Sequence, residues 1–154
     1  MSESGSRVTF LVVDDDDVAI MGMQRAIRKL DLSNPVEIAR DGEEALAMLR
    51  GADGRVNRPY IVTLDLNMPR MGGLEFLEEV RQDEALHDAI IFVVTTSDAP
   101  SDIAAAYSQN IAGYIIKDNA YETLKSALDL LRTYTNLVRL PQADAAATLE
   151  LRMI

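Results

Sequence analysis

The chain has 154 residues, enough for one domain with a hydrophobic core, and its apolar and charged fractions, 48% and 26%, are ordinary for a globular protein. Fifteen basic and 25 acidic side chains give a net charge of −10, which disfavours nonspecific attraction to nucleic acid or an anionic membrane surface. The absence of cysteine excludes disulfides, thiol catalysis and cysteine-ligated zinc. The single histidine, His87, excludes a multi-histidine metal site, and we expect it to lie in a polar surface loop.

No apolar run approaches the length that spans a membrane. The N-terminal residues MSESGS have neither the basic nor the apolar region of a signal peptide, and we expect residues 1–6 to be disordered. We therefore expect a cytoplasmic protein with no membrane and no nucleic-acid partner, and the lack of cysteine fits a reducing compartment.

Strand-like and helix-like segments alternate along the chain. Continuous runs of β-branched and apolar residues, as in buried parallel strands, cover 8–13, 36–39, 60–64, 90–94 and 113–116. Helical patterns follow them at 18–30, 41–49, 74–80, 98–107 and 121–139. Five successive strand–helix units predict an α/β fold, a doubly wound parallel sheet with helices on both faces. Right-handed crossovers favour the flavodoxin-like (βα)5 strand order 2-1-3-4-5.

This order brings the ends of four strands to one edge of the sheet. The residues that follow these ends are Asp14 to Asp17 after the first strand, Asp65 after the third, Thr95, Thr96 and Ser97 at the fourth, and Lys117 after the fifth. In an open α/β sheet, ligands bind at the carboxyl ends of the strands. Close carboxylates repel by about 4 kcal/mol per pair at an effective dielectric constant of about 20, so a positive charge is needed there.

A hard divalent cation is the predicted source of this charge. An oxygen-only set of a few carboxylates and waters suits octahedral Mg²⁺ better than the many-oxygen cage of Ca²⁺, and no DxDxDG calcium loop is present. We assign Asp14 and Asp15, at the strand end, to the metal. We assign Asp16 and Asp17 to the start of the following helix, where acids accept hydrogen bonds from free N–H groups and are stabilised by the positive end of the helix dipole.

These motifs resemble the receiver domain of two-component response regulators. The likeness covers about residues 7–139 and rests on four segments in order, VVDDDD, LDLNMP, VVTTS and GYIIKD. The intervals also agree, with thirty residues from Asp65 to Thr95 and twenty-two from Thr95 to Lys117. The stretches LDLNMPRMGG, FVVTTS and NIAGYIIK and the Leu-Pro tail further resemble stand-alone receivers paired with bacterial phytochrome kinases.

The resemblance implies a single-domain response regulator that is phosphorylated by a sensor histidine kinase, such as a bacteriophytochrome, or by a histidine phosphotransfer protein. The implied site residues are Asp65 as phosphoacceptor; Asp14, Asp15, Asp65 and the main-chain carbonyl of Asn67 as Mg²⁺ ligands; Thr95, Thr96 and Lys117 at the phosphoryl group; and Tyr114 as the aromatic residue of the switch. Such a protein assists its own phosphorylation and dephosphorylation but is not a conventional enzyme. Phosphorylation would draw Thr95 inward and let Tyr114 fill the vacated space.

The sequence departs from the receiver pattern in three places. Asp118 follows Lys117 where receivers usually have a cis proline; because a cis bond before another residue costs about 2.5–4 kcal/mol, we expect a trans peptide or a rearranged loop. Thr96 stands where many receivers have alanine and would narrow access to the phosphate. After Leu140 and Pro141 only thirteen residues remain, so we expect no second domain.

Several alternatives remain open at this stage. Asp65 alone could be a solvated acid at a strand end, Lys117 could pair with it for structural reasons, and Tyr114 could be an ordinary surface residue of a strand. A haloacid-dehalogenase-type phosphatase also uses an aspartate nucleophile and Mg²⁺, but it needs a second acid where this chain has Asn67. A receiver-shaped binding module that works without phosphorylation is the other rival.

The last helix carries more apolar surface than one core face requires. Its predicted inner stripe consists of Leu124, Ala127, Leu128, Leu131 and Val138. Leu130, Tyr134 and Leu137 widen this stripe beyond the usual width of about 100°. In the extension 140–154, the apolar residues Leu149, Leu151 and Met153 alternate with charged ones, as in an extended arm. We expect a symmetric homodimer built from this arm and the outer helix face, since the extension resembles the C-terminal extensions of phytochrome-type receivers. The alternative is a disordered tail.

Overall fold

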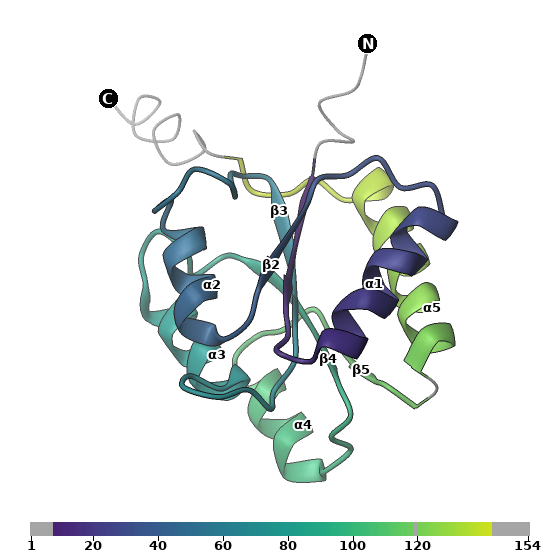
Figure 1. Cartoon of the computed structure of the whole chain (residues 1–154). Helices are drawn as coiled ribbons and strands as arrows, with labels where there is room; N and C mark the ends of the chain where they lie inside the picture. The colour runs from purple at the N-terminus through teal and green to yellow at the C-terminus, as the bar shows by residue number, and fades with distance from the viewer. Residues whose placement is uncertain (1–7, 119, 143–154) are drawn as a thin grey trace.

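The sheet contains five strands, and each is followed by a helix. The computed structural model describes residues 8–118 and 120–142, and every structural statement below refers to these residues. The elements are β1 (Thr9–Val13), α1 (Asp17–Lys29), β2 (Val36–Ala39), α2 (Gly42–Leu49), β3 (Tyr60–Leu64), α3 (Gly73–Gln82), β4 (Ile90–Thr95), α4 (Pro100–Tyr107), β5 (Gly113–Ile116) and α5 (Ala120–Leu137). All strand pairings are parallel and the order is β2-β1-β3-β4-β5 (Figure 1), which confirms the predicted fold.

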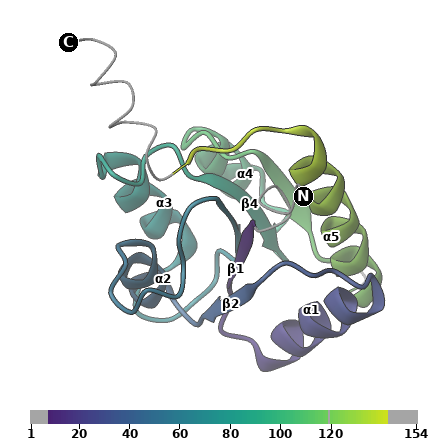
Figure 2. The same ribbon diagram turned by 90° about the horizontal axis from the view of Figure 1, so that it is seen from above.

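Two hydrophobic cores lie on opposite faces of this sheet. Successive residues of a strand point to opposite faces; Leu11 and Val13 of β1 therefore pack with α2 and α3, while Phe10 and Val12 pack with α1 and α5. Figure 2 shows α1 and α5 side by side on one side of the sheet and α2 and α3 on the other. Because both faces are covered, the strands lack polar alternation, as the continuous apolar runs predicted.

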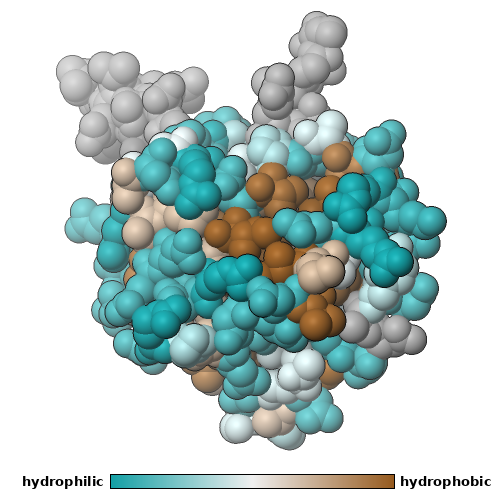
Figure 3. Space-filling view, in the orientation of Figure 1, coloured by the Kyte–Doolittle hydropathy of each residue, from teal (hydrophilic) through white to brown (hydrophobic). Residues whose placement is uncertain are grey.

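The two edge strands are less covered than the central ones. Residues of β5 are all partly exposed, and so are the first three residues of β2, whereas β1 and β3 are fully buried. Figure 3 shows apolar surface over β2, between α2 and α1. No helix among the described residues is both long and apolar enough to cross a membrane.

Polar side chains define the starts of the first two helices. The carboxylate of Asp16 accepts the N–H of Val18 at 3.0 Å, which makes Asp16 the N-cap of α1, as predicted. Asp41 caps α2 by accepting the N–H of Glu44 at 2.8 Å, and Glu44 in return accepts the N–H of Arg40 at 2.8 Å. The first bond is an N-cap and the second holds the residue before it, so together they fix the corner between β2 and α2.

The end of α5 differs from the expectation. The helix ends at Leu137, so Val138 lies beyond it with 37% of its surface exposed and is not part of the inner stripe. Tyr134, expected on the outer face, packs inward, and its ring meets that of Phe92 edge to face with centroids 5.5 Å apart. Leu130 and Leu137 do lie outside, with exposed fractions of 50% and 78%. The arm residues Leu149, Leu151 and Met153 lie outside the described residues, as do residues 1–6.

Candidate functional site

Two neighbouring central strands deliver the first two carboxylates of the site. Val13 of β1 and Leu64 of β3 are register partners, so the residues after them, Asp14 and Asp65, lie side by side at the carboxyl edge of the sheet. Both are still held by main-chain bonds to neighbouring strands: the N–H of Asp65 donates to Val13 at 2.9 Å and that of Asp14 to Ala39 at 3.0 Å. Both residues are buried. Their positions are therefore set by the sheet and not by a loop.

Asp15 completes a group of three carboxylates. Ligand oxygens of Asp14, Asp15 and Asp65 all lie within 4.8 Å of one another, with Asp15 the exposed member. Three carboxylate oxygens at this separation, with no nitrogen or sulfur donor in the set, fit a hard divalent cation such as Mg²⁺. Asn67 is exposed, two residues beyond Asp65 in the loop that leads to α3. The structure thus brings together the three carboxylates among the four metal ligands that the sequence suggested.

Lys117 enters the site from the edge strand β5. Its ammonium nitrogen Nζ lies 2.8 Å from Oδ2 of Asp14, and both side chains are more than nine-tenths buried. The partner is thus Asp14 and not Asp65, which was the pair considered from the sequence. The other oxygen of Asp14 accepts the N–H of Asp16 at 3.0 Å. The peptide bond from Lys117 to Asp118 is trans, as expected. Among the described residues, the cis peptide bond is the one between Arg58 and Pro59.

Burial governs the charge state of Asp65. Loss of hydration raises the pKa of this carboxyl above its usual range, and the neighbouring charge of Asp14 acts in the same direction. The Thr95 hydroxyl, the Lys117 ammonium and the N–H of Leu66, 2.9 Å from Oδ1, oppose the rise. Asp65 is therefore a carboxylate stripped of most of its water, with Oδ1 held by the N–H of Leu66.

Thr95 and Tyr114 are joined through the loop between β4 and α4. Thr95 is completely buried, whereas Thr96 is exposed. The Tyr114 hydroxyl donates to the carbonyl oxygen of Ser97 at 2.9 Å, and the Ser97 N–H lies 3.5 Å from the hydroxyl oxygen of Thr95. The Ser97 hydroxyl in turn donates to Asp102 in the first turn of α4 at 2.6 Å. One short loop thus connects the buried hydroxyl, the aromatic ring and α4.

Sequence reasoning did not identify the contacts of Ser97 with Asp102 or of Asp41 with Arg70. In the second contact, the guanidinium of Arg70, in the loop after β3, reaches Oδ2 of Asp41 at 2.5 Å. The two partners are 29 residues apart, so no local pattern signals the pair. Ser97 and Asp102 are five residues apart, which is not the spacing of a helix-capping pair, so no standard pattern signals this contact either.

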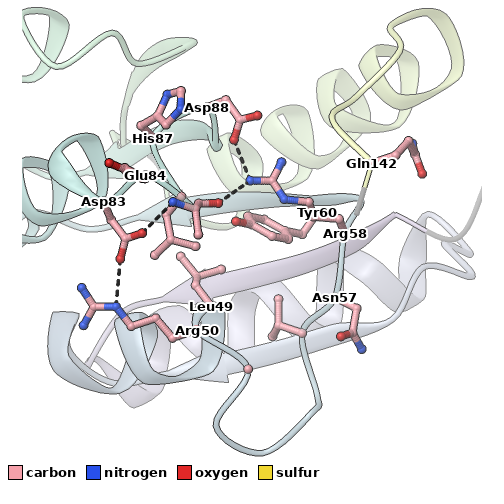
Figure 4. A pocket seen from close by; sticks show the side chains of 14 residues that line it. Leu49, Arg50, Asn57, Arg58, Tyr60, Asp83, Glu84, His87, Asp88 and Gln142 are labelled. Carbon is pink, nitrogen blue, oxygen red and sulfur yellow. Dashed lines mark hydrogen bonds and ion pairs between the residues drawn. The ribbon is translucent and has the colours of Figure 1, made fainter. Parts of the chain in front are cut away.

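A cavity of about 620 Å³ lies at the opposite end of β3, away from the carboxylates (Figure 4). Tyr60, the first residue of β3, lines it, together with Leu49, Leu86 and Gln142. Ion pairs Arg50–Asp83, at 3.1 Å, and Arg58–Asp88, at 2.6 Å, flank it. Since β3 spans five residues, this cavity is about 16 Å from Asp65 and plays no part in its chemistry.

Comparisons with known proteins agree with this geometry. In sequence, the chain is 34% identical over 125 residues to the probable methanogenesis regulatory protein FilR2 of Methanothrix harundinacea, covering 80% of this chain and 81% of that protein. It is 29% identical over 144 residues to the response regulator Rcp1 of Synechocystis sp. PCC 6803, covering 92% and 98% of the two chains.

Solved structures give the same result. The Mn²⁺-bound form of Rcp1 matches with a TM-score of 0.76 and 28% identity over 87% of this chain and 99% of that one. The phosphorylated cyanobacterial phytochrome response regulator RcpA matches with a TM-score of 0.79 and 28% identity over 88% and 99%. The family profile of the response regulator receiver domain matches residues 10–129. With this match over most of its length and its acidic site at the carboxyl edge of the sheet, the chain belongs to the response regulator receiver domain family.

Proposed function

We propose that this protein is a single-domain response regulator that accepts a phosphoryl group on Asp65 from a histidine kinase in a Mg²⁺-dependent reaction. The observation that carries the proposal is the convergence of Asp14, Asp15 and Asp65, with oxygens within 4.8 Å of one another, beside a buried lysine. A Mn²⁺-bound form of Rcp1 and a phosphorylated form of RcpA support both halves of the proposal by similarity.

The residues of the site fit an in-line phosphoryl transfer. One carboxylate oxygen of Asp65 forms the new bond to phosphorus while the bond from phosphorus to the imidazole nitrogen of the donor's phosphohistidine breaks. The carboxylate loses no proton, and the leaving imidazole carries the electron pair away. When bound, Mg²⁺ neutralises charge on the transferring oxygens, which is the main requirement of such a loose transition state. Lys117 adds a second positive charge if it moves from Asp14 to a phosphoryl oxygen.

The same residues suit a phosphorylation-driven change of surface. A phosphoryl group on Asp65 offers acceptors to the Thr95 hydroxyl, and a shift of Thr95 pulls on Ser97 and hence on Tyr114 and α4. The surface that changes would be that of α4, β5 and α5. Thr96, exposed beside this path, would limit access of water or partner to the phosphate.

We assign the partner by similarity. RcpA is named as a phytochrome response regulator, and a bacteriophytochrome response regulator, RtBRR, matches with a TM-score of 0.70 and 25% identity. We therefore propose a phytochrome-type histidine kinase as donor, directly or through a histidine phosphotransfer protein. Residues 7–139 form the receiver in this scheme, and 140–154 form an extension that takes part in a homodimer.

Labelling with a small phosphodonor tests the proposal. Acetyl phosphate with Mg²⁺ should label the wild-type chain, and chelation of the metal should stop the reaction. The Asp65→Asn variant should take up no label, because the amide is not a nucleophile. Label that persists on a folded Asp65→Asn chain would refute the assignment of the acceptor. A wild-type chain that stays unlabelled by any donor but still binds its partner would favour the phosphorylation-independent module.

A further inference from the structure

The loop that carries Asn67 is weakly held by its own main chain. It leaves β3 at Asp65 and enters α3 at Gly73, whose N–H donates to the carbonyl of Leu66 at 3.0 Å. Among the described residues, no main-chain N–H of residues 67–72 donates to a main-chain carbonyl, and Pro69 has no N–H to donate. Contacts from outside the loop are therefore needed to fix its course beyond Leu66, including the position of the Asn67 carbonyl.

The corner between β2 and α2 supplies that attachment. The Arg70 guanidinium reaches the Asp41 carboxylate at 2.5 Å, and one residue on, the Met71 carbonyl accepts the N–H of Gly42 at 3.0 Å. Gly42 leaves no room for a side chain, because a Cβ there would come within 2.7 Å of the Met71 side chain. The loop is thus fastened to this corner by an ion pair, a main-chain bond and a close contact.

Asp41 is a rigid anchor for this attachment. Only 6% of its side chain is exposed, and its second oxygen is fixed by the N–H of Glu44 at the start of α2. Burial opposes ionisation, but the hydrogen bonds from Glu44 and Arg70 outweigh it and keep the pKa of Asp41 below its usual range. A charged, immobile acceptor therefore faces the loop at neutral pH.

Arg70 has a backbone conformation that points the same way. Its φ is 61°, in the left-handed region that a side chain such as arginine seldom adopts. Such a conformation costs about 1–3 kcal/mol and persists only where the surroundings determine it. The contacts to Asp41 and Gly42 are the ones the structure offers to offset this cost.

We propose that Asp41 and Arg70 are positioning residues that hold the loop where the Asn67 carbonyl can join Asp14, Asp15 and Asp65 around the divalent cation. The inference rests on the proposed function, because it concerns the metal site used there. Contacts outside the ligand set commonly contribute 10-fold to 100-fold to metal affinity by orienting a ligand. Here the link runs from one loop to another and leaves the three carboxylates untouched.

Mn²⁺ binding to the metal-free full-length chain, followed by electron paramagnetic resonance or calorimetry, tests this role. Arg70→Ala should raise the Mn²⁺ Kd about 10-fold in a chain that still folds, because the Arg70 side chain is 60% exposed and belongs to neither hydrophobic core. Asp41→Asn retains a capping oxygen and should raise the Kd similarly. The double variant should be no weaker than either single one, since both changes release the same contact. Gly42→Ala should raise the Kd by pushing on Met71.

The Arg50→Ala variant is the matched control. It removes a similar pair, Arg50–Asp83, with an arginine side chain 50% exposed, at the far end of the sheet, and its Kd should equal that of the wild type. If Arg70→Ala and Arg50→Ala bind Mn²⁺ as tightly as the wild type, the positioning role is wrong. A wild-type chain that binds no Mn²⁺ at all would overturn the proposed metal site itself, and this inference with it.

Discussion

At the scale of single residues, Asp65 is placed where its charge is both useful and costly. The carboxylate lies among the ends of β1, β3 and β4, close to Asp14 and away from most of the solvent. Its raised pKa reflects this burial and the charge of Asp14, which Lys117 and Thr95 offset only in part. A group that is poorly solvated and near a cation site is suited to attack an electrophile, but without the cation it weakens the fold.

The first prediction concerns this cost, in buffer free of divalent metal. The pKa of Asp65 is higher in the folded than in the unfolded chain, so its contribution to stability is full below the unfolded pKa and is lost as pH rises through the folded pKa. At neutral pH the charged group is therefore unfavourable, and Asp65→Asn should raise the melting temperature by about 2–4 °C per kcal/mol relieved in a chain of this size. The gain should shrink as pH falls toward the carboxyl's range.

Thermal melts at several pH values, with Asp15→Asn as the exposed control, give the measurement. The control should change the melting temperature little, because Asp15 is exposed. An Asp65→Asn chain that is less stable than the wild type at neutral pH would contradict the electrostatic account. So would a gain that stays the same in acid.

The second prediction separates phosphorylation from its consequence. Thr95→Ala and Lys117→Ala should still accept label on Asp65 but should lose the response of the loop that contains Ser97, because we propose that the hydroxyl and the ammonium move to the phosphoryl oxygens from their present partners. Hydrogen exchange of residues 96–99, with and without acetyl phosphate, reports this response. Thr95→Ser and Lys117→Arg are the controls that keep hydroxyl and charge. An unchanged phosphate response in both alanine variants would show that neither residue carries the switch.

At the scale of elements, the sequence predicted the strands better than the ends of the helices. A strand buried on both faces has a continuous apolar pattern, so β1, β3 and β4 were recognisable within one residue. The start of α4 was placed two residues early because the Ser97 hydroxyl, bound to Asp102 and to the N–H of Ala99, holds this segment as a loop until Pro100. At α5, the wide apolar stripe contained a tyrosine that packs inward, and periodicity alone does not separate such a ring from an exposed one.

The third prediction concerns the hydrogen bonds that connect α3 to the loops around β4 and α4. The Arg81 guanidinium, near the end of α3, donates to the carbonyls of His87, Ala89, Gln109 and Asn110 at 2.8, 2.9, 2.6 and 3.1 Å. These bonds connect α3 to the segment before β4, at His87 and Ala89, and to the segment after α4, at Gln109 and Asn110. Arg81→Met leaves these carbonyls without their donor and should lower the free energy of unfolding by at least about 2 kcal/mol.

Urea unfolding of Arg81→Met beside Arg50→Met measures this effect. The control removes the half-exposed Arg50 side chain, which forms one ion pair, with Asp83, among the described residues, and it should cost less than about 1 kcal/mol. Equal losses in the two variants would mean that the four carbonyl bonds contribute nothing beyond a surface charge.

At the scale of the whole molecule, strand order explains why the site was predictable. Once the sheet is 2-1-3-4-5, Asp14, Asp65, Thr95 and Lys117 must meet at one edge, although they are spread over more than a hundred residues. The pairings within the site were not predictable in the same way. The ion pairs Lys117–Asp14 and Arg70–Asp41 depend on loop conformations, and no periodic sequence pattern encodes these.

The fourth prediction concerns assembly. Leu130 and Leu137 leave apolar surface on the outside of α5, and we expect this face and the extension 140–154 to form a homodimer. Light scattering should find a dimer for the full chain at tens of micromolar and a monomer for a version that ends at Leu140. Two monomers would make the dimer prediction wrong, and two dimers would show that the extension does not hold it together.

The central claim, that Asp65 receives the phosphoryl group, is tested most directly by locating the modified residue. An acyl phosphate is reduced by borohydride to an alcohol, which converts a phosphorylated aspartate into homoserine. After treatment with acetyl phosphate and Mg²⁺, then borohydride and peptide mass spectrometry, we predict homoserine at position 65 and at no other acid, and none once the metal is chelated. Homoserine at Asp14 or Asp15 in place of Asp65, or equal yields with and without metal, would contradict the account.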